Sequence, residues 1–280
     1  MSQDTLERYK ALVDRHVQAV PAEFQCGEVL RDACAYALEG GKRLRGSILL
    51  CFFEALGGQA EEALDFAAAL EMIQAYSLVH DDLPCMDDDD FRRGKPSCHK
   101  KFGYSTALLA GDALLTAAFE VAARSPSLPP DRVVRGLATL SRAAGPSGMV
   151  GGQILDLGFE RSPGGADKVR KMYALKTGAL FQASARLGAI LAGAPQETED
   201  AAGEWGSLFG YAFQVLDDLE DDDQSQKEQD KDTLARETSR EEACLEAKEA
   251  LEAALALLGH FKGRATLAED LTRRYLIRAT

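Results

Sequence analysis

Apolar residues recur every three or four positions along almost the whole of this 280-residue chain, which is the spacing of an α-helix with an apolar face. The clearest stretches are LDFAAALEMIQAYSLVH at 64–80 and VRKMYALKTGALFQASARLGAIL at 169–191. No alternating stretch is long enough to predict a sheet, and the sequence contains neither Asn-Gly nor Asp-Gly. The predicted fold class is therefore all-α.

Glycine and proline clusters divide the helical pattern into ten or more helices joined by short loops. Apolar residues make up 46% of the chain and prolines number only nine, so a sizeable core is expected and disorder is not. No linker, repeat or low-complexity tract separates two domains. We therefore expect a single all-helical domain over residues 1–280.

The formal net charge of -13 argues against a nucleic-acid-binding protein and against docking on an anionic membrane. It does not exclude a phosphorylated small molecule, because bound metal ions reverse the local charge. The polar N-terminus is unlike a signal peptide, and no run of 18 apolar residues predicts membrane insertion. Six cysteines without a CxxC pair predict reduced thiols in a cytoplasmic protein.

Two acidic clusters stand out, and each follows a strongly apolar helical stretch. In the second, FQVLDDLEDDDQ, Asp217 and Asp221 are four residues apart and share a helix face, with Asp218 beside them. Carboxylates gathered in this way form a site for Mg²⁺, which completes its coordination with water and phosphate oxygens. The alternative is a solvated acidic helix face.

The first cluster, HDDLPCMDDDD at 80–90, is less regular. Asp81 and Asp87 are six residues apart, which a regular helix would place on different faces. Pro84 should end or distort the helix, since it lacks a backbone donor and clashes with the preceding turn. The broken end could then return Asp87 toward Asp81 and Asp82.

Basic residues accompany the acidic ones. GGKRLR places Lys42, Arg43 and Arg45 at a helix start, where cations oppose the helix dipole unless an anion binds there. Arg92 and Arg93 follow the first acidic cluster, either to bind a diphosphate or to balance nearby charge.

Two further motifs lie between the acidic clusters. KTGALF sets Lys176 and Thr177 in an apolar helix, where a lysine could also extend to water. GGQILD places Gln153 and Asp156 on one face, suited to direct contact or to supporting hydrogen bonds.

In this order, GGKRLR, AYSLVHDDLPCMDDDDFRRGKPSCHKKFG, GGQILD, KTGALF and FQVLDDLED resemble the trans-isoprenyl diphosphate synthases over roughly residues 35–232. The bacterial farnesyl diphosphate synthase type is the most similar. The resemblance implies an all-helical isoprenoid synthase fold around a deep central cavity and a homodimer. It also implies three Mg²⁺ ions per active site, replaceable by Mn²⁺, and the condensation of isopentenyl diphosphate with an allylic diphosphate.

The resemblance also implies residue roles. The metal ligands would be Asp81, Asp82 and Asp87 in the first motif and Asp217, Asp218 and Asp221 in the second. The allylic diphosphate would contact Arg92, Lys176 and Lys231. Isopentenyl diphosphate would contact Lys42, Arg45, Gln74 and Arg93. Thr177 and Gln214 would lie near the allylic carbocation.

Product length is predicted from Tyr76 and Ser77, which lie about one helical turn before Asp81. An aromatic ring at that depth would limit how far a prenyl tail extends. Relatives that make geranylgeranyl diphosphate tend to have a smaller residue at the position of Tyr76. We therefore predict a C15 product.

The chain departs from its relatives in two places. Gly46 replaces a proline, which we expect only to loosen the helix start. The segment DDQSQKEQDKDTLARET after the second motif is polar, lacks glycine and is about ten residues short. Lys231 aligns there with a diphosphate-binding lysine, and Lys227 is the candidate for a second. This shortening weakens the expected closure over the diphosphate.

Three other functions compete with this interpretation. A geranyl or geranylgeranyl diphosphate synthase would differ only in product. A class I terpene cyclase would not need GGKRLR or the second arginine of the pair, and DDLED is unlike its second metal motif. A non-catalytic regulatory subunit is supported by the short segment alone, and the intact aspartates oppose it.

Overall fold

The structure is a computed structural model that describes residues 2–159, 165–224 and 233–279. Its residues are overwhelmingly helical, so the prediction of an all-α fold is confirmed. The chain forms two compact units. Unit 1 contains Gln3–Leu50 and Gln59–Leu137, and unit 2 contains Cys51–Gly58 and Ala138–Thr280. The single domain of the sequence analysis stays a prediction.

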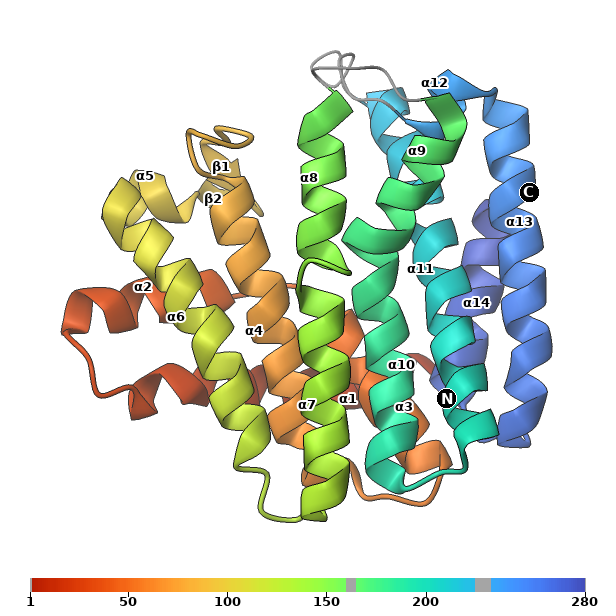
Figure 1. The fold of residues 1–280 in the computed structure, drawn as a ribbon, viewed down its shortest axis with the longest axis horizontal. Coiled ribbons are helices and arrows are strands. Elements are labelled where there is room, and N and C mark those ends of the chain that lie inside the picture. The colour runs from red at the N-terminus through yellow and green to blue at the C-terminus, as the bar shows by residue number, and fades with distance from the viewer. Residues whose placement is uncertain (1, 160–164, 225–232, 280) are drawn as a thin grey trace. The chain divides into compact units, whose positions relative to one another are not determined.

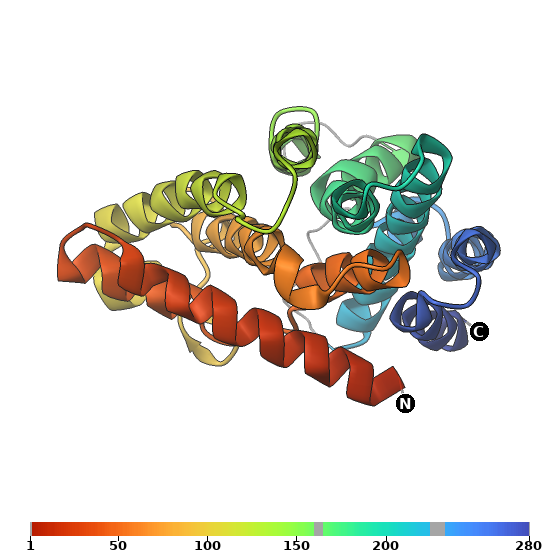
Figure 2. The ribbon, with the colours of Figure 1, turned by 90° about the horizontal axis from the view of Figure 1, so that it is seen from below.

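Unit 1 is built around two long helices that lie side by side, α4 (Leu64–Asp81) and α6 (Tyr104–Ala123) (Figure 2). Alanine dominates the start of α4, and residues 66–73 are all buried. Gly111 allows α6 to approach α4, because a Cβ there would lie 2.0 Å from His80 Nε2. The other elements are α1 (Ser2–Ala19), η1 (Val20–Glu23), α2 (Glu28–Leu38), most of α3 (Leu44–Ala55), η2 (Ala60–Ala63), α5 (Cys98–Phe102) and the first half of α7 (Pro130–Ala144).

Helix α6 is long and apolar enough to cross a membrane by length and composition, with a mean hydropathy of 1.4 over its most apolar window. The window is 44% buried within the protein, and α6 packs on α4 and α2. The core helix of a globular protein has the same properties, so this observation is weak evidence for a membrane span.

Unit 2 centres on α11 (Gln196–Gln224), with α10 (Ala179–Ala192) and α13 (Arg240–Leu257) packed beside it (Figure 1). Trp205 and Phe209 stack with ring centroids 5.0 Å apart. Gly206 lets α11 approach α10, since a Cβ there would lie 2.4 Å from the Phe181 carbonyl oxygen. The remaining elements are the second half of α7, α8 (Met149–Phe159), α9 (Gly165–Tyr173), η3 (Ala174–Gly178), α12 (Leu234–Glu237), η4 (Leu258–Phe261) and α14 (Thr266–Arg278).

A small antiparallel hairpin that the helical pattern did not predict follows the first acidic cluster. Strands β1 (Phe91–Arg92) and β2 (Lys95–Pro96) pair through Phe91 with Pro96 and Arg92 with Lys95. Arg93 and Gly94 form the turn with φ of 55° and 73°, and two positive φ values are what a tight hairpin turn requires. The hairpin was missed because its strands have only two residues each.

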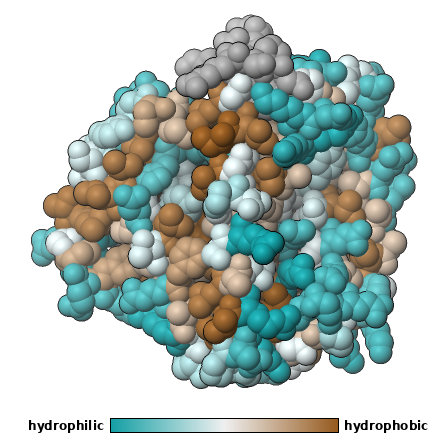
Figure 3. Space-filling model, in the orientation of Figure 1, coloured by the Kyte–Doolittle hydropathy of each residue, from teal (hydrophilic) through white to brown (hydrophobic). Residues whose placement is uncertain are grey.

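Several large apolar side chains remain exposed. They include Leu109 on α6, 56% exposed, and Ile154 on α8, 65% exposed. Apolar residues also interrupt the hydrophilic surface on the face drawn in Figure 3.

Candidate active site

The first aspartate motif lies where α4 ends. The helix stops at Asp81, three residues before Pro84, as the proline predicts. The chain then turns back on itself, and the backbone N–H of Asp87 donates to the carbonyl oxygen of Asp81 at 2.9 Å. The N–H of Asp88 donates to the Leu83 carbonyl at 3.2 Å. The expected return of Asp87 toward Asp81 is confirmed for the backbone.

Asp82 is 2% exposed and is bound by Arg92. Arg92 Nε donates to Asp82 Oδ1 at 2.9 Å, and Nη2 donates to the same oxygen and to Asp89 Oδ2. Burial raises the pKa of Asp82 despite this arginine. Arg92 therefore balances the charge of nearby carboxylates, one of the two roles that the sequence allowed. It also lies directly beside Asp82, a predicted metal ligand.

Other aspartates of this acidic loop form ion pairs with basic side chains. Asp90 pairs with Lys100 at 2.6 Å, and Asp89 pairs with Arg92. Ligand atoms of Asp88, Asp90 and His99 lie within 4.8 Å of one another. Asp89 and Asp90 thus pair with basic side chains.

Arg93 lies in the hairpin turn and contacts the end of α2 and the glycine pair that follows it. Its Nη1 donates to the Glu39 carbonyl at 3.0 Å, and its guanidinium covers Gly41, where a Cβ would lie 3.1 Å from Nη2. A cavity of about 190 Å³ adjoins this place and is lined by Gly40, Asp82, Arg92, Arg93 and Lys95 among others. Arg93 therefore lies next to the paired glycines that precede Lys42.

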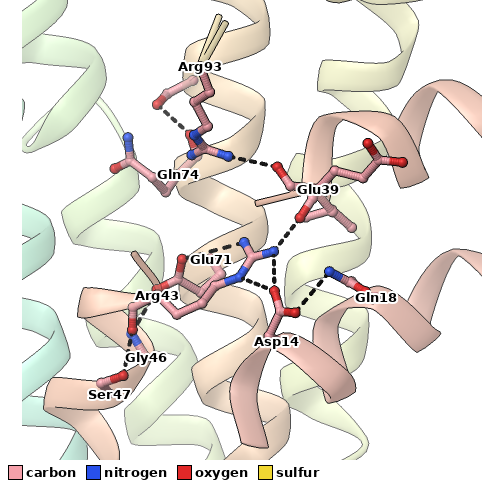
Figure 4. Close-up of polar contacts among 11 residues, drawn as sticks. Asp14, Gln18, Glu39, Arg43, Gly46, Ser47, Glu71, Gln74 and Arg93 are labelled. Carbon is pink, nitrogen blue, oxygen red and sulfur yellow. Dashed lines mark hydrogen bonds and ion pairs between the residues drawn. The ribbon is translucent and has the colours of Figure 1, made fainter. Parts of the chain in front are cut away.

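Arg43 follows the paired glycines, and its buried side chain binds to neighbouring elements of unit 1 (Figure 4). Its side chain is 2% exposed and donates to Asp14 Oδ1 on α1 at 2.9 Å and to the Leu38 carbonyl. Its Nη1 lies 3.8 Å from Glu71 Oε2 on α4. Arg43 holds a positive φ of 50°, so this buried network maintains a backbone conformation that few residues adopt.

Gly46 does more than the sequence analysis expected, which was only to loosen the helix start. Its backbone N–H donates to Glu71 Oε1 at 2.9 Å, a bond that a proline could not make. A Cβ at this position would also lie 3.0 Å from Val13 Cγ1. The loosened helix start stays a prediction, to which the structure adds a hydrogen bond between α3 and α4.

The predicted isopentenyl diphosphate residues surround this turn. Lys42 is exposed, and burial lowers the pKa of Arg45 to about 10, an effect that Glu71 partly offsets. Gln74 is half-buried, and Figure 4 shows its side chain near that of Arg93. Unit 1 thus brings Lys42, Arg45, Gln74 and Arg93 to the region of one glycine turn.

Tyr76 and Ser77 lie on α4 before the first motif. Tyr76 is 5% exposed, and burial followed by the charge of Asp81 raises its pKa to about 12. Its ring meets that of His80 edge-on at 5.7 Å. Ser77 Oγ donates to the Gln74 carbonyl at 3.0 Å. Tyr76 is therefore a buried, neutral residue of α4.

The second aspartate motif lies on α11 in unit 2, and hydrogen bonds hold its Asp218 on both sides. Gln214 Nε2 donates to Asp218 Oδ1 at 2.8 Å, and Gln214 Oε1 accepts from Thr177 Oγ1 at 2.6 Å. Tyr173 donates to Asp218 Oδ2. The predicted residues Thr177, Gln214 and Asp218 therefore form one connected group.

Tyr173 is a residue that the sequence analysis missed. It is 1% exposed, and burial followed by Asp218 raises its pKa, so the hydroxyl stays protonated and donates. A usable signal was present, because Tyr173 lies three residues before Lys176 and four before Thr177 on the same helical face.

Lys176 and Thr177 lie in η3, a π-helical turn between α9 and α10. Lys176 Nζ forms an ion pair with Asp156 Oδ2 of the GGQILD segment. Gly152 of that segment permits the contact, since a Cβ there would lie 2.2 Å from the Lys176 backbone nitrogen. Gln153 Nε2 is buried without a hydrogen-bond partner in the described part of the chain. π-turns of this kind are frequent at functional sites.

Two predicted residues are not described in full. Asp221 belongs to α11, but its side chain lies outside the described residues, as does Lys231. Each motif by itself offers hard carboxylate oxygens: the turn at Asp87 prearranges part of the first motif in unit 1, and hydrogen bonds orient Asp218 of the second motif in unit 2. Such a set fits Mg²⁺, which prefers carboxylate and phosphate oxygens.

Comparison with known proteins gives a consistent result. The polyprenyl synthetase family model matches residues 27–252. Geranylgeranyl pyrophosphate synthase 7 of Arabidopsis thaliana is 42% identical over 203 residues, which cover 71% of this chain and 58% of that protein. Farnesyl diphosphate synthase of Geobacillus stearothermophilus is 44% identical over 195 residues, which cover 69% and 66%. The match thus spans less than two thirds of the length of either relative.

Among solved structures, the apo FPP/GFPP synthase of Zymomonas mobilis superimposes with a TM-score of 0.90 at 33% sequence identity. The superposition covers 98% of this chain and 99% of that one. Sequence and fold therefore point to the same group of proteins.

Proposed function

The chain belongs to the polyprenyl synthetase family, and from this premise we propose that it is a Mg²⁺-dependent prenyltransferase. It condenses isopentenyl diphosphate with dimethylallyl or geranyl diphosphate to give farnesyl diphosphate. The observation that carries the proposal is the turn that returns Asp87 to Asp81 beside the pair formed by Asp82 and Arg92. This turn gathers carboxylates and a guanidinium at the end of one helix.

The chemistry requires ionisation of an allylic C–O bond, so negative charge develops on the leaving diphosphate. Bound Mg²⁺ would supply most of the neutralisation, held by Asp81, Asp82, Asp87, Asp217, Asp218 and Asp221. Arg92, Lys176 and Lys231 would add fixed positive charge on the diphosphate. Their positions would be set in advance, as the ion pair of Lys176 with Asp156 already illustrates.

The carbocation left behind needs a neutral, water-excluding pocket, because water would otherwise capture it. Thr177 Oγ1 and Gln214 Oε1 are joined by a hydrogen bond of 2.6 Å, so their dipoles are already oriented. Lys42, Arg45, Gln74 and Arg93 would hold isopentenyl diphosphate for attack on the cation. The proton lost in the final elimination would go to the released diphosphate.

A C15 product is supported by Tyr76, whose large side chain is fixed within α4. The curated relatives include both farnesyl and geranylgeranyl diphosphate synthases, so a geranylgeranyl product is the second candidate. The two differ in how far the prenyl tail extends past Tyr76. A cytoplasmic homodimer completes the proposal and follows from family resemblance.

The decisive experiment incubates purified protein with Mg²⁺, labelled isopentenyl diphosphate and either dimethylallyl or geranyl diphosphate. We expect label in a C15 alcohol after dephosphorylation and chromatography. A C20 alcohol would select the second candidate. Absence of incorporation with every allylic primer would rule out the prenyltransferase and favour a terpene cyclase or a regulatory subunit.

A further inference from the structure

A single hydroxyl group joins the second aspartate motif to a separate segment of unit 2. Tyr173 Oη donates to Asp218 Oδ2 on α11 and accepts a hydrogen bond of 3.1 Å from the backbone N–H of Leu234. Leu234 is the first residue of α12 and is 1% exposed. A hydroxyl can serve both contacts because it donates and accepts at once.

The same carboxylate is also held from its other side. Asp218 Oδ1 accepts from Gln214 Nε2, and Gln214 in turn accepts from Thr177. Groups from α9, η3 and α11 therefore fix one side chain, and both of its oxygens have a donor. Such constraint exceeds what a surface acidic residue needs and is typical of a carboxylate whose direction matters.

We propose that Tyr173 is a positioning residue for divalent-metal binding at the second aspartate motif, because its hydroxyl orients Asp218 and ties the backbone of α12 to it. The inference rests on the proposed function of that motif. Groups that orient metal-binding carboxylates from behind typically change metal affinity 10- to 100-fold when they are removed. Tyr173 touches neither substrate nor metal in this scheme and acts through Asp218.

The chain offers a matched control in Tyr211. Its ring centroid lies 6.3 Å from that of Tyr173, and burial raises the pKa of both hydroxyls. Tyr211 Oη donates to Glu246 Oε2 on α13 at 2.6 Å, so its hydroxyl is bound to a different helix from that of Asp218. Tyr173→Phe and Tyr211→Phe thus each remove one hydroxyl from the same region. The first removes the donor to Asp218, and the second removes a donor to Glu246.

The test measures Mn²⁺ binding in the presence of inorganic pyrophosphate, with free Mn²⁺ followed by electron paramagnetic resonance. We expect Tyr173→Phe to raise the dissociation constant of the weakest Mn²⁺ site at least 10-fold and Tyr211→Phe to change it less than twofold. Hydrogen exchange at residues 233–238 should accelerate in Tyr173→Phe alone. These readouts do not depend on turnover.

Equal Mn²⁺ affinity in Tyr173→Phe and the unmodified protein would overturn the inference, as would an equal loss in Tyr211→Phe. The result is separable from the proposed function. Prenyl transfer by the unmodified protein with unchanged metal affinity in Tyr173→Phe would refute only the role of Tyr173. Weaker Mn²⁺ binding by Tyr173→Phe in a protein that transfers no prenyl group would support the positioning role and refute the proposed activity.

Discussion

The backbone N–H of Asp87 donates a hydrogen bond to the carbonyl oxygen of Asp81, 2.9 Å away, although five residues intervene. This bond closes the loop that Pro84 opens at the end of α4. It brings two acidic residues to one place before any ion binds. The backbone therefore loses part of its conformational entropy on folding and not when a cation binds.

Replacing Asp81 or Asp217 should lower turnover by two or more orders of magnitude. Each carboxylate would hold Mg²⁺, and the metal would stabilise the negative charge that develops on the leaving diphosphate. Losing one group that supports such stabilisation commonly costs about 10²- to 10³-fold. Steady-state assays of Asp81→Asn and Asp217→Asn with labelled isopentenyl diphosphate measure this. Asp90→Asn, in an exposed pair with Lys100, is the control and should keep near-normal rates. Near-normal rates in Asp81→Asn or Asp217→Asn would refute a metal role for that residue.

Removing the Arg43 guanidinium should destabilise the fold strongly. Arg43→Met leaves Glu71 and Asp14 without their buried partner, and breaking a buried ion pair costs about 3–5 kcal/mol. Denaturant unfolding gives the value. Arg124→Met breaks an exposed pair with Glu23 and should cost less than about 1 kcal/mol. Equal losses in the two variants would contradict the structural importance of Arg43.

Tyr76→Ala should give products longer than those of the unmodified protein. The substitution removes a large buried ring from α4, about one turn before Asp81. The space left by the ring would let a longer prenyl tail fit. Chromatography of dephosphorylated products measures their length. Ser77→Ala, which keeps the ring, should change the distribution far less. Unchanged lengths in Tyr76→Ala would show that another residue limits the chain.

Alkylation should distinguish an exposed cysteine from two buried ones. Cys85 is exposed in the acidic loop, whereas burial raises the pKa of Cys34 and Cys51 to about 12. The thiolate is the reactive form, so neither buried thiol should react near neutral pH. Mass spectrometry after a short iodoacetamide pulse should find Cys85 modified before Cys34 and Cys51. Unfolded protein supplies the control, and equal labelling of the native protein would contradict the buried positions.

Acid should weaken the contact of Glu246 with Arg170 and Tyr211. Hydrogen bonding from Arg170 holds the pKa of Glu246 below its usual value. Its contribution to stability is therefore present above the unfolded pKa of about 4.3 and is lost as the pH falls through the lower folded value. Glu246→Gln should be less stable at pH 7, and the difference should shrink toward pH 3. A constant difference across this range would refute the linkage.

The sequence predicted those features that depend on local spacing. Helical periodicity predicted the all-α fold, and Pro84 predicted both the end of α4 and the return of Asp87. Arg92 and Arg93 could not be assigned partners from spacing alone. The hairpin turn separates them, and it consists of too few residues to leave a periodic signal.

Contacts between distant segments were not predictable in the same way. The burial of Arg43 depends on Asp14, Glu71 and the end of α2, which lie far apart in the sequence. Gly152 and Gly46 serve close packing against other helices, and only the structure shows what a Cβ would meet. Tyr173 escaped notice because a tyrosine in an apolar stretch is ordinarily a core residue.

The π-turn at η3 has a consequence for how this helix tolerates insertions and deletions. A π-turn holds one more residue per hydrogen-bonded ring than the α-helix on either side, so α9 and α10 are out of phase by about one residue. Deleting Ala174 or Leu175, the two residues between Tyr173 and Lys176, would let the two helices merge into one regular α-helix. That shorter helix would gain ordinary hydrogen bonds, yet it would rotate Tyr173 by about 100° relative to Lys176 and Thr177. The π-turn at η3 thus sets the relative direction of three polar side chains.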